Sequence, residues 1–321
     1  MEKYFIITVD TEGDNLWEPV IRPSGMRNIT VKNAAYIERF QKLCEKYHFI
    51  PTYLVNYEMA QAEPFAGMAK EWVKDRKCEI GMHMHAWNAP PIYELQYKRG
   101  SSNPYAGEYP REILWKKLKG LTELLQEQFE VKPVSHRGGR WYIDAWYIRA
   151  LEKLGYTVDC SVTPGVSWKS HIGYERGGRD YTKYPQKVYR IDHKHIYEEG
   201  HSNILEVPPT ITDMPLLARV NEVLHRPYAY KEIMSKKIWL RPNGNNLEDM
   251  LGIVDKYEKS ECDYLEFMIH SSELMPGGSP TFVSKSSIEN MYSHLETVFE
   301  RIQDFYHGIM LSSYAERRLD K

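Results

Sequence analysis

The feature that most constrains the fold is a repeated alternation of strand-like and helix-like segments along the 321 residues. Apolar β-rich runs predict strands at residues 4–10, 49–57, 78–86, 131–136, 157–162, 204–207, 238–240, 265–270 and 309–313. Helical spacing of apolar residues predicts helices at 31–47, 66–76, 111–129, 143–154, 216–225, 247–257 and 286–305. This alternation predicts an α/β fold with a parallel sheet covered by helices, and at this length a barrel or partial barrel.

The chain reads as one domain over residues 1–321, because no repeat, low-complexity tract or linker divides it. Three irregular segments, 13–28, 87–110 and 163–203, each follow a predicted strand. The site of a parallel barrel is built where the strands end. These segments are therefore expected to be loops on the rim of the site.

Composition excludes several classes of protein. A net charge of -2 argues against a broad basic surface for nucleic acid. No stretch approaches the roughly 20 apolar residues that span a bilayer, and the apolar run at 4–9 is too short for a signal peptide. The 4 cysteines are far apart and are expected to be reduced thiols. We therefore expect a cytoplasmic protein without a transmembrane segment, and the sequence leaves its oligomeric state open.

Polar, ligand-capable side chains stand at the ends of several predicted strands. The first strand ends in Asp10 and Glu12, and the third ends in His83 and His85. Later strands supply Arg137, Asp159 and His270. Any one of these could be a satisfied polar group of the core. Because the strands of one barrel end at the same rim, the whole set predicts a single site.

His83 and His85 are the most informative pair. Residues i and i+2 of a strand point to the same face, so both imidazoles can reach one metal ion. A carboxylate from Asp10 or Glu12 would complete three protein ligands and leave a position open for water, as in catalytic zinc sites. The sequence therefore predicts one divalent metal ion, with zinc expected. A rival pair, His193 and His195, lies in a charged stretch and is expected to be solvated.

These residues resemble the polysaccharide deacetylase family, carbohydrate esterase family 4 with the NodB homology domain. The resemblance rests on five ordered motifs, which read TVDTE (8–12), EIGMHMHAW (79–87), SHRGGRW (135–141), YTVDCSV (156–162) and FMIH (267–270). It implies a distorted or partial (β/α) barrel of about seven parallel strands. The tail HSSELMPGG (270–278) is similar to a subgroup associated with surface-polysaccharide biosynthesis.

Two positions depart from the family pattern. Thr11 replaces the second aspartate of the first motif, and Glu12 is the nearest carboxylate that can take its place. Trp87 stands where the second histidine is usual, so we transfer that role to His85. The resemblance then implies a metal site of His83, His85 and Glu12, with Asp10 as the alternative carboxylate ligand.

The resemblance also implies an activity, the hydrolysis of the N-acetyl amide of a sugar in a polysaccharide or its biosynthetic precursor. Asp10 would act as general base, held by Arg137, and His270 would protonate the leaving amine. Asp159 would orient a histidine, with His270 the expected partner. The expected substrate-binding residues are Trp87, Arg140, Trp141, Arg176 and Arg179.

Segment 163–203 carries Arg176 and Arg179 among several tyrosines, which suits a cap over a sugar that bears a phosphate or acid. A solvated loop packed by its own tyrosines is the alternative. Two other functions remain open at this point. One is hydrolysis of another linear amide, of the ureide or formamide type, on the same scaffold. The other is a non-catalytic carbohydrate-binding protein.

Overall fold

A computed structural model describes residues 2–14, 16, 29–96, 102–216, 219–220, 224 and 236–319. Its central element is a curled sheet built from β1 (Tyr4–Thr11), β2 (Pro51–Val55), β3 (Glu79–Met84), β4 (Ser135–Gly138), β5 (Val158–Asp159), β6 (Tyr189–Arg190), β7 (Leu205–Glu206), β10 (Tyr264–His270) and β11 (His307–Gly308). The strand order is β10-β1-β2-β3-β4-β5-β7-β6, with β11 beside β1. Every neighbouring pair from β10 to β7 is parallel. The partial barrel of about seven parallel strands expected from the sequence is confirmed, with β11 as a further parallel strand beside β1.

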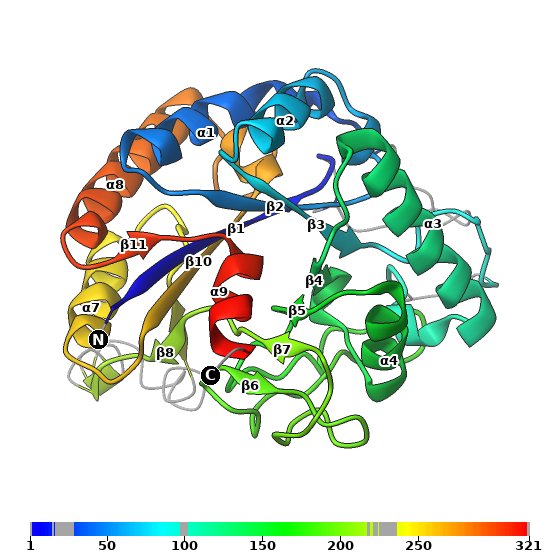
Figure 1. Ribbon diagram of the computed structural model, residues 1–321. Helices are drawn as coiled ribbons and strands as arrows, with labels where there is room; N and C mark the ends of the chain where they lie inside the picture. Colours follow the sequence, from blue (N-terminus) through cyan, green and yellow to red (C-terminus); the bar gives the residue numbers. More distant parts are fainter. Residues whose placement is uncertain are drawn as a thin grey trace.

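Helices form the layer outside this sheet (Figure 1). They are α1 (Ile37–Lys46), α2 (Phe65–Lys74), α3 (Arg111–Phe129), α4 (Ala145–Leu154), α7 (Leu247–Glu258) and α8 (Lys285–Gln303). Local sequence sets some of their ends. Asp144 caps α4 by accepting a hydrogen bond from the Tyr147 amide at 2.8 Å, and Gly155, with φ 89°, is the C-cap that follows Leu154. None of the described helices is long and apolar enough to cross a membrane.

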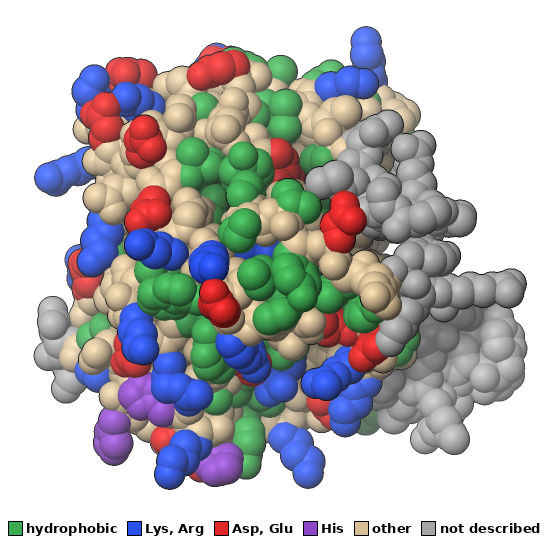
Figure 2. Space-filling model, turned by 90° about the vertical axis from the view of Figure 1, so that its right-hand side faces the viewer, with side chains coloured by type: hydrophobic (Ala, Val, Ile, Leu, Met, Phe, Trp, Pro, Cys, Tyr) green, Lys and Arg blue, Asp and Glu red, His purple; other side chains and the backbone are tan. Residues whose placement is uncertain are grey.

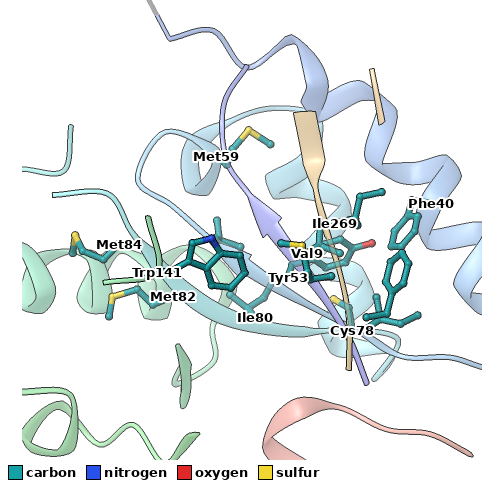
Figure 3. Packing of buried hydrophobic residues seen from close by; sticks show 14 of the residues in the cluster. Val9, Phe40, Tyr53, Met59, Cys78, Ile80, Met82, Met84, Trp141 and Ile269 are labelled. Atoms are coloured by element: carbon teal, nitrogen blue, oxygen red, sulfur yellow. The ribbon is translucent and has the colours of Figure 1, made fainter. Parts of the chain in front are cut away.

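Side chains of each strand alternate between the helices and the barrel interior. Phe5, Ile7 and Val9 of β1 face outward into the main core, which Figure 3 shows with Val9 beside Tyr53 and Ile269. The intervening residues face inward and change in character along the strand. The interior where the strands begin holds apolar side chains together with the hydrogen-bonded pair Thr52 and Glu79. Toward the strand ends the inward side chains are mainly polar.

The C-terminal segment differs from its prediction. Residues 309–313 were expected to form a strand, but β11 ends at Gly308 and α9 (Leu311–Leu319) follows. The amides of Leu311 and Ser312 donate to Thr52 Oγ1 and Glu79 Oε2 inside the barrel, which satisfies the first turn of α9. Helix α9 thereby covers the end of the barrel where the strands begin (Figure 1).

The strand predicted at 238–240 also lies elsewhere than expected. It corresponds to β9 (Lys237–Trp239), which pairs antiparallel with β8 (Ile211–Asp213) in a separate two-stranded sheet. The segment that follows β7 runs beside β10 in space. There the Thr210 amide donates to the Glu266 carbonyl at 3.0 Å. Most of the helix predicted at 216–225 lies outside the described residues.

The three predicted rim segments are described to different extents. Most of 13–28 lies outside the described residues, as do 97–101 within the second segment. Segment 163–203 is fully described and contains β6 and the isolated bridges Ser167↔Asp180 and Ile172↔Gly177. It is therefore a folded part of the domain.

On the face seen in Figure 2, Lys and Arg side chains are interspersed with Asp and Glu.

Candidate metal centre and active site

The polar ends of β1, β3 and β10 meet at one cavity of about 290 Å³. Strand register explains the meeting: Asp10 of β1 lies beside His270 of β10, and His83 of β3 lies beside Arg137 of β4. Glu12 and His85 continue the same faces just past the ends of β1 and β3. The sequence prediction that these residues converge at one rim agrees with this geometry.

Glu12, His83 and His85 form a compact set of metal-ligating atoms, all within 4.8 Å of one another. Glu12 Oε2 lies 3.1 Å from His85 Nε2 and 3.4 Å from His83 Nε2. His83 Nδ1 is 3.0 Å from the Arg137 carbonyl, which can only accept, so Nδ1 carries the hydrogen. In the neutral ring, Nε2 then presents its lone pair to a carboxylate oxygen. Converging lone pairs of this kind fit a bound cation.

The electrostatics of the set favour a positive charge between these groups. Burial by itself would lower the pKa of His83, but the charges of Asp10 and Glu12 outweigh it and raise that pKa, so a proton or a metal ion is stabilised at this point. Burial by itself would raise the pKa of Glu12, but the charges and hydrogen bonds of His270, His83 and His85 outweigh it and lower that pKa. Burial, together with the charge of His83, lowers the pKa of His85. An ionised carboxylate and a neutral imidazole are the forms that bind a metal ion.

Asp10 is held beside this set by a buried guanidinium. Arg137 Nη1 donates to Asp10 Oδ1 at 2.6 Å, and Nη2 donates to Glu266 Oε1 at 2.7 Å. The other oxygen, Asp10 Oδ2, lies 3.6 Å from His270 Nε2 and 4.0 Å from His83 Nε2. Burial by itself would raise the pKa of Asp10, but Arg137 and the two histidines outweigh it and lower that pKa. Asp10 is therefore ionised, with one oxygen fixed and the other facing the cavity.

His270 is oriented by two residues that sequence reasoning did not assign to the site. Its Nδ1 lies 3.1 Å from Glu273 Oε2, and Arg241 Nη2 donates to Glu273 Oε1 at 2.8 Å. Burial by itself would raise the pKa of Glu273, but Arg241 and His270 outweigh it and lower that pKa to about 2. Arg241 Nη2 also lies 3.0 Å from His270 Nδ1, so Nδ1 accepts from Arg241 in one tautomer and donates to Glu273 in the other, while Nε2 faces Asp10 in both. The tail motif contained Glu273, but nothing in the sequence linked it to His270 or to Arg241.

Asp159 does not make the contact expected of it with His270. Its Oδ1 lies 2.6 Å from His136 Nδ1 and accepts from Ser161 Oγ at 2.8 Å. The reason is strand alternation, because Asp159 and its neighbour His136 face the helices and not the barrel interior. The expected pairing with His270 is corrected to a pairing with His136, outside the cavity.

The remaining predicted residues divide between two cavities. Trp87, Arg140 and Trp141 line the cavity of the metal-ligating set, and Trp87 stacks on His85 with ring centroids 4.2 Å apart. Arg176 and Arg179 line a second cavity of about 310 Å³ instead. Their predicted role in substrate binding therefore stays a prediction, because they do not line the cavity of the metal-ligating set. The second cavity and the first have Tyr105 as a common wall residue.

The rival histidine pair lies at the surface. His193 Nε2 is 2.8 Å from Glu152 Oε2, with 41% of the His193 side chain exposed. His195 contacts Tyr197 through its ring, at a centroid distance of 5.7 Å. Neither residue joins a metal-ligating group of three among the described residues.

No protein-family model matches the chain, and no curated protein is significantly similar to it in sequence. Solved structures do match. One is a Mycobacterium smegmatis protein assigned as a polysaccharide deacetylase, with TM-score 0.52 and 12% identity, covering 100% of this chain and 92% of the other. Another, from Parabacteroides distasonis and assigned as a glycoside hydrolase/deacetylase, has TM-score 0.66 and 13% identity over 99% of this chain and 72% of the other.

A third match shows that the fold is shared with other chemistry. The 4-alpha-glucanotransferase of Thermococcus litoralis has TM-score 0.56 and 13% identity, covering 99% of this chain and 41% of its own length. At such identities the likeness establishes the fold, and the reaction has to be argued from the site. The chain has the (β/α) barrel fold of the polysaccharide deacetylase type.

Proposed function

We propose that this protein is a metal-dependent hydrolase that removes the acetyl group from an N-acetylated sugar of a polysaccharide or of its biosynthetic precursor. The observation that carries this proposal is the convergence of Glu12, His83 and His85 on one point, beside Asp10 and His270, at a single cavity. These groups match the roles that hydrolysis of an amide needs: ligands for a Lewis acid, a base and an acid.

Glu12, His83 and His85 would hold one divalent ion, and zinc is the metal that this nitrogen and oxygen donor set favours. Such an ion supplies Lewis acidity to the acetyl carbonyl and to the attacking water. Neighbouring groups of the protein hold these ligands in position. His83 is fixed in one tautomer by the Arg137 carbonyl, and Trp87 covers one face of the His85 ring.

Asp10 and His270 would move the protons. Asp10 Oδ2 takes a proton from the water that attacks the acetyl carbon, while Arg137 holds Oδ1 and keeps the carboxylate ionised. His270 then gives a proton from Nε2 to the amine nitrogen as the carbon–nitrogen bond breaks. The ring that gives this proton is the imidazolium form, whose Nδ1 donates to the Glu273 carboxylate, and the proton held by Asp10 Oδ2 returns to Nε2 to restore that form. Acetate and a free amino sugar are the products.

The cavity suits a sugar in size and lining. A volume of about 290 Å³ is close to the lower limit for small-molecule sites, roughly 300 to 1,000 Å³, which suits a small ligand such as one sugar unit. Trp87, Trp141 and Trp168 line it beside polar Asn103 and His171. Flat aromatic faces pack against the apolar faces of sugar rings, and amides and imidazoles bond their hydroxyls.

The test is to screen the metal-loaded protein for acetate release from N-acetylated sugars, oligomers and sugar phosphates, with metal content measured on the same preparation. Acetate release that is lost on chelation and restored by zinc supports the proposal. Release from formamide or ureide compounds without acetate release would assign the site to another linear amide. Sugar binding by a protein that holds no metal and releases no product would make it a carbohydrate-binding protein.

A further inference from the structure

Three arginines lie at the candidate site, and one of them differs from the others in its charge balance. Arg137 is bridged to Glu266 at 2.7 Å, and Arg241 is bridged to Glu273 at 2.8 Å. Arg140 lines the same cavity, yet no carboxylate of a described residue lies within 4.0 Å of its guanidinium. No described carboxylate therefore forms an ion pair with Arg140, and Glu108, whose oxygens accept from four backbone amides, acts on it only at longer range.

Neutral groups hold Arg140 in place. Its Nη1 donates to the Asn103 carbonyl, its Nη2 donates to the Ile172 carbonyl at 3.2 Å, and its guanidinium lies 4.0 Å from the centroid of the Tyr105 ring. These contacts orient the guanidinium without cancelling its charge. Burial lowers the pKa of Arg140, which shows that holding this cation here has a cost in desolvation. A half-buried, oriented cation that lines a cavity without forming an ion pair is the arrangement expected of an anion-binding group.

The backbone that presents Arg140 is also unusual. Arg140 and Trp141 both lie in the left-handed region, with φ 55° and 59°, a conformation that costs free energy for residues other than glycine. Gly139, just before them, has no room for a side chain, because a Cβ there would collide with the His85 ring. The turn after β4 is thus pressed against the metal-ligating set, and Arg140 stands on the adjoining wall of the cavity.

We propose that Arg140 binds an anionic group of the substrate, a phosphate or a carboxylate carried on the acetylated sugar. This inference rests on the proposed deacetylase function and narrows its substrate to a charged sugar. The planar guanidinium matches two oxygens of either anion. The sequence suggested Arg176 and Arg179 for this task, but those residues line the second cavity beyond Tyr105.

The test uses product analogues, so that it requires binding and not turnover. Titration calorimetry of the metal-loaded protein would compare glucosamine 1-phosphate, the matching amino uronic acid and neutral glucosamine. One charged sugar should bind at least about tenfold more tightly than glucosamine, as expected for a charge-assisted pair. Arg140→Gln should remove this preference, and Arg140→Lys should retain part of it. The comparison of the two charged sugars tells phosphate from carboxylate.

Arg176→Gln is the matched control, because Arg176 is an exposed arginine from the wall of the second cavity. It should keep the preference, and all variants should keep the metal content of the wild type. Equal affinity of the wild type for charged and neutral sugars, or no binding of any of them, would overturn the proposal. So would a preference that survives in Arg140→Gln and disappears in Arg176→Gln. A charge preference without acetate release would count against the deacetylase function and leave the anion site standing.

Discussion

Two clusters of histidines and carboxylates occupy neighbouring strands of the barrel, and one of them lines the cavity of the candidate site. In the first, Glu12, His83 and His85 line the cavity together with Asp10 and His270. In the second, His136, Asp159 and Glu206 lie side by side on β4, β5 and β7, where strand register places them in one row. All three are fully buried, and none lines that cavity.

The difference follows from which face of the strand each residue occupies. Arg137 points into the barrel and bonds Asp10, while the adjacent His136 points outward and bonds Asp159 and, at 3.1 Å, the Tyr147 hydroxyl of α4. Burial and the charge of Asp159 raise the pKa of Glu206 well above its ordinary value, so this carboxyl is protonated. The outward cluster is thus a closed network of the core, whereas the inward one faces a space that a ligand can enter.

Metal content should separate the two clusters most sharply. Wild-type protein should hold about one equivalent of zinc by element analysis, and His83→Ala should hold much less, because it removes one of three ligands. His136→Asn, which keeps a donor beside Asp159, should bind the full equivalent. His193→Ala serves as a surface control from the rival histidine pair and should also bind normally.

Equal zinc contents in wild type and His83→Ala would show that the inward cluster does not bind the metal. Loss of zinc in His193→Ala would move the metal to the surface pair, and loss in a folded His136→Asn would give the outward cluster a role in the metal site. A thermal melt of each variant would show that the comparison is made on folded protein.

Asp10→Asn should keep the metal and lose activity by roughly 10²- to 10⁴-fold, the usual contribution of a general base. Asparagine can still accept from Arg137 but cannot take a proton from water at neutral pH. His270→Ala should lose activity by a similar factor, because it removes the acid. The measurement is kcat with zinc content determined in parallel. If Asp10→Asn empties the site, Asp10 is a ligand and Glu12 becomes the candidate base.

Much of the barrel could be predicted from the sequence because strand and helix patterns are local. Runs such as 4–10 and 265–270 are apolar enough to be placed from their own residues. The segment 309–313 is apolar too, but its helix depends on Thr52 and Glu79, which the fold brings to the amides that begin α9. A contact between residues more than 200 positions apart leaves no local pattern to read.

The candidate site shows the same limit. His83 and His85 were found because their spacing of two fixes a common face within one strand. Asp159 was given the wrong partner because the face of a two-residue strand cannot be read from so short a pattern. Glu273 was overlooked as the partner of His270 because it bonds back to that strand end through a short 3₁₀ turn, Ser271–Leu274.

Glu273→Gln should lower kcat by about 10- to 100-fold, the range for partners that orient a functional histidine, and by less than His270→Ala. Glutamine can still accept from Nδ1 but has no charge to stabilise the protonated ring. KM should change less than kcat, because the effect falls on proton transfer. Glu273→Asp, which keeps the charge, should recover part of the activity. Equal losses in Glu273→Gln and Glu273→Asp would point to packing and not to charge.

Asp159→Asn should have the smallest effect on the reaction and a measurable one on stability. The carboxylate bonds His136 at 2.6 Å and accepts from Ser161 in a region sealed from water. Weakening such buried bonds costs about 1 to 3 kcal/mol in the free energy of unfolding. Urea denaturation should show this loss, while kcat/KM and zinc content stay within about twofold of wild type, since a twofold change is only about 0.4 kcal/mol. A folded Asp159→Asn with normal stability and a hundredfold loss of kcat would mean that the outward cluster acts on the reaction after all, through Arg137, which shares the strand with His136.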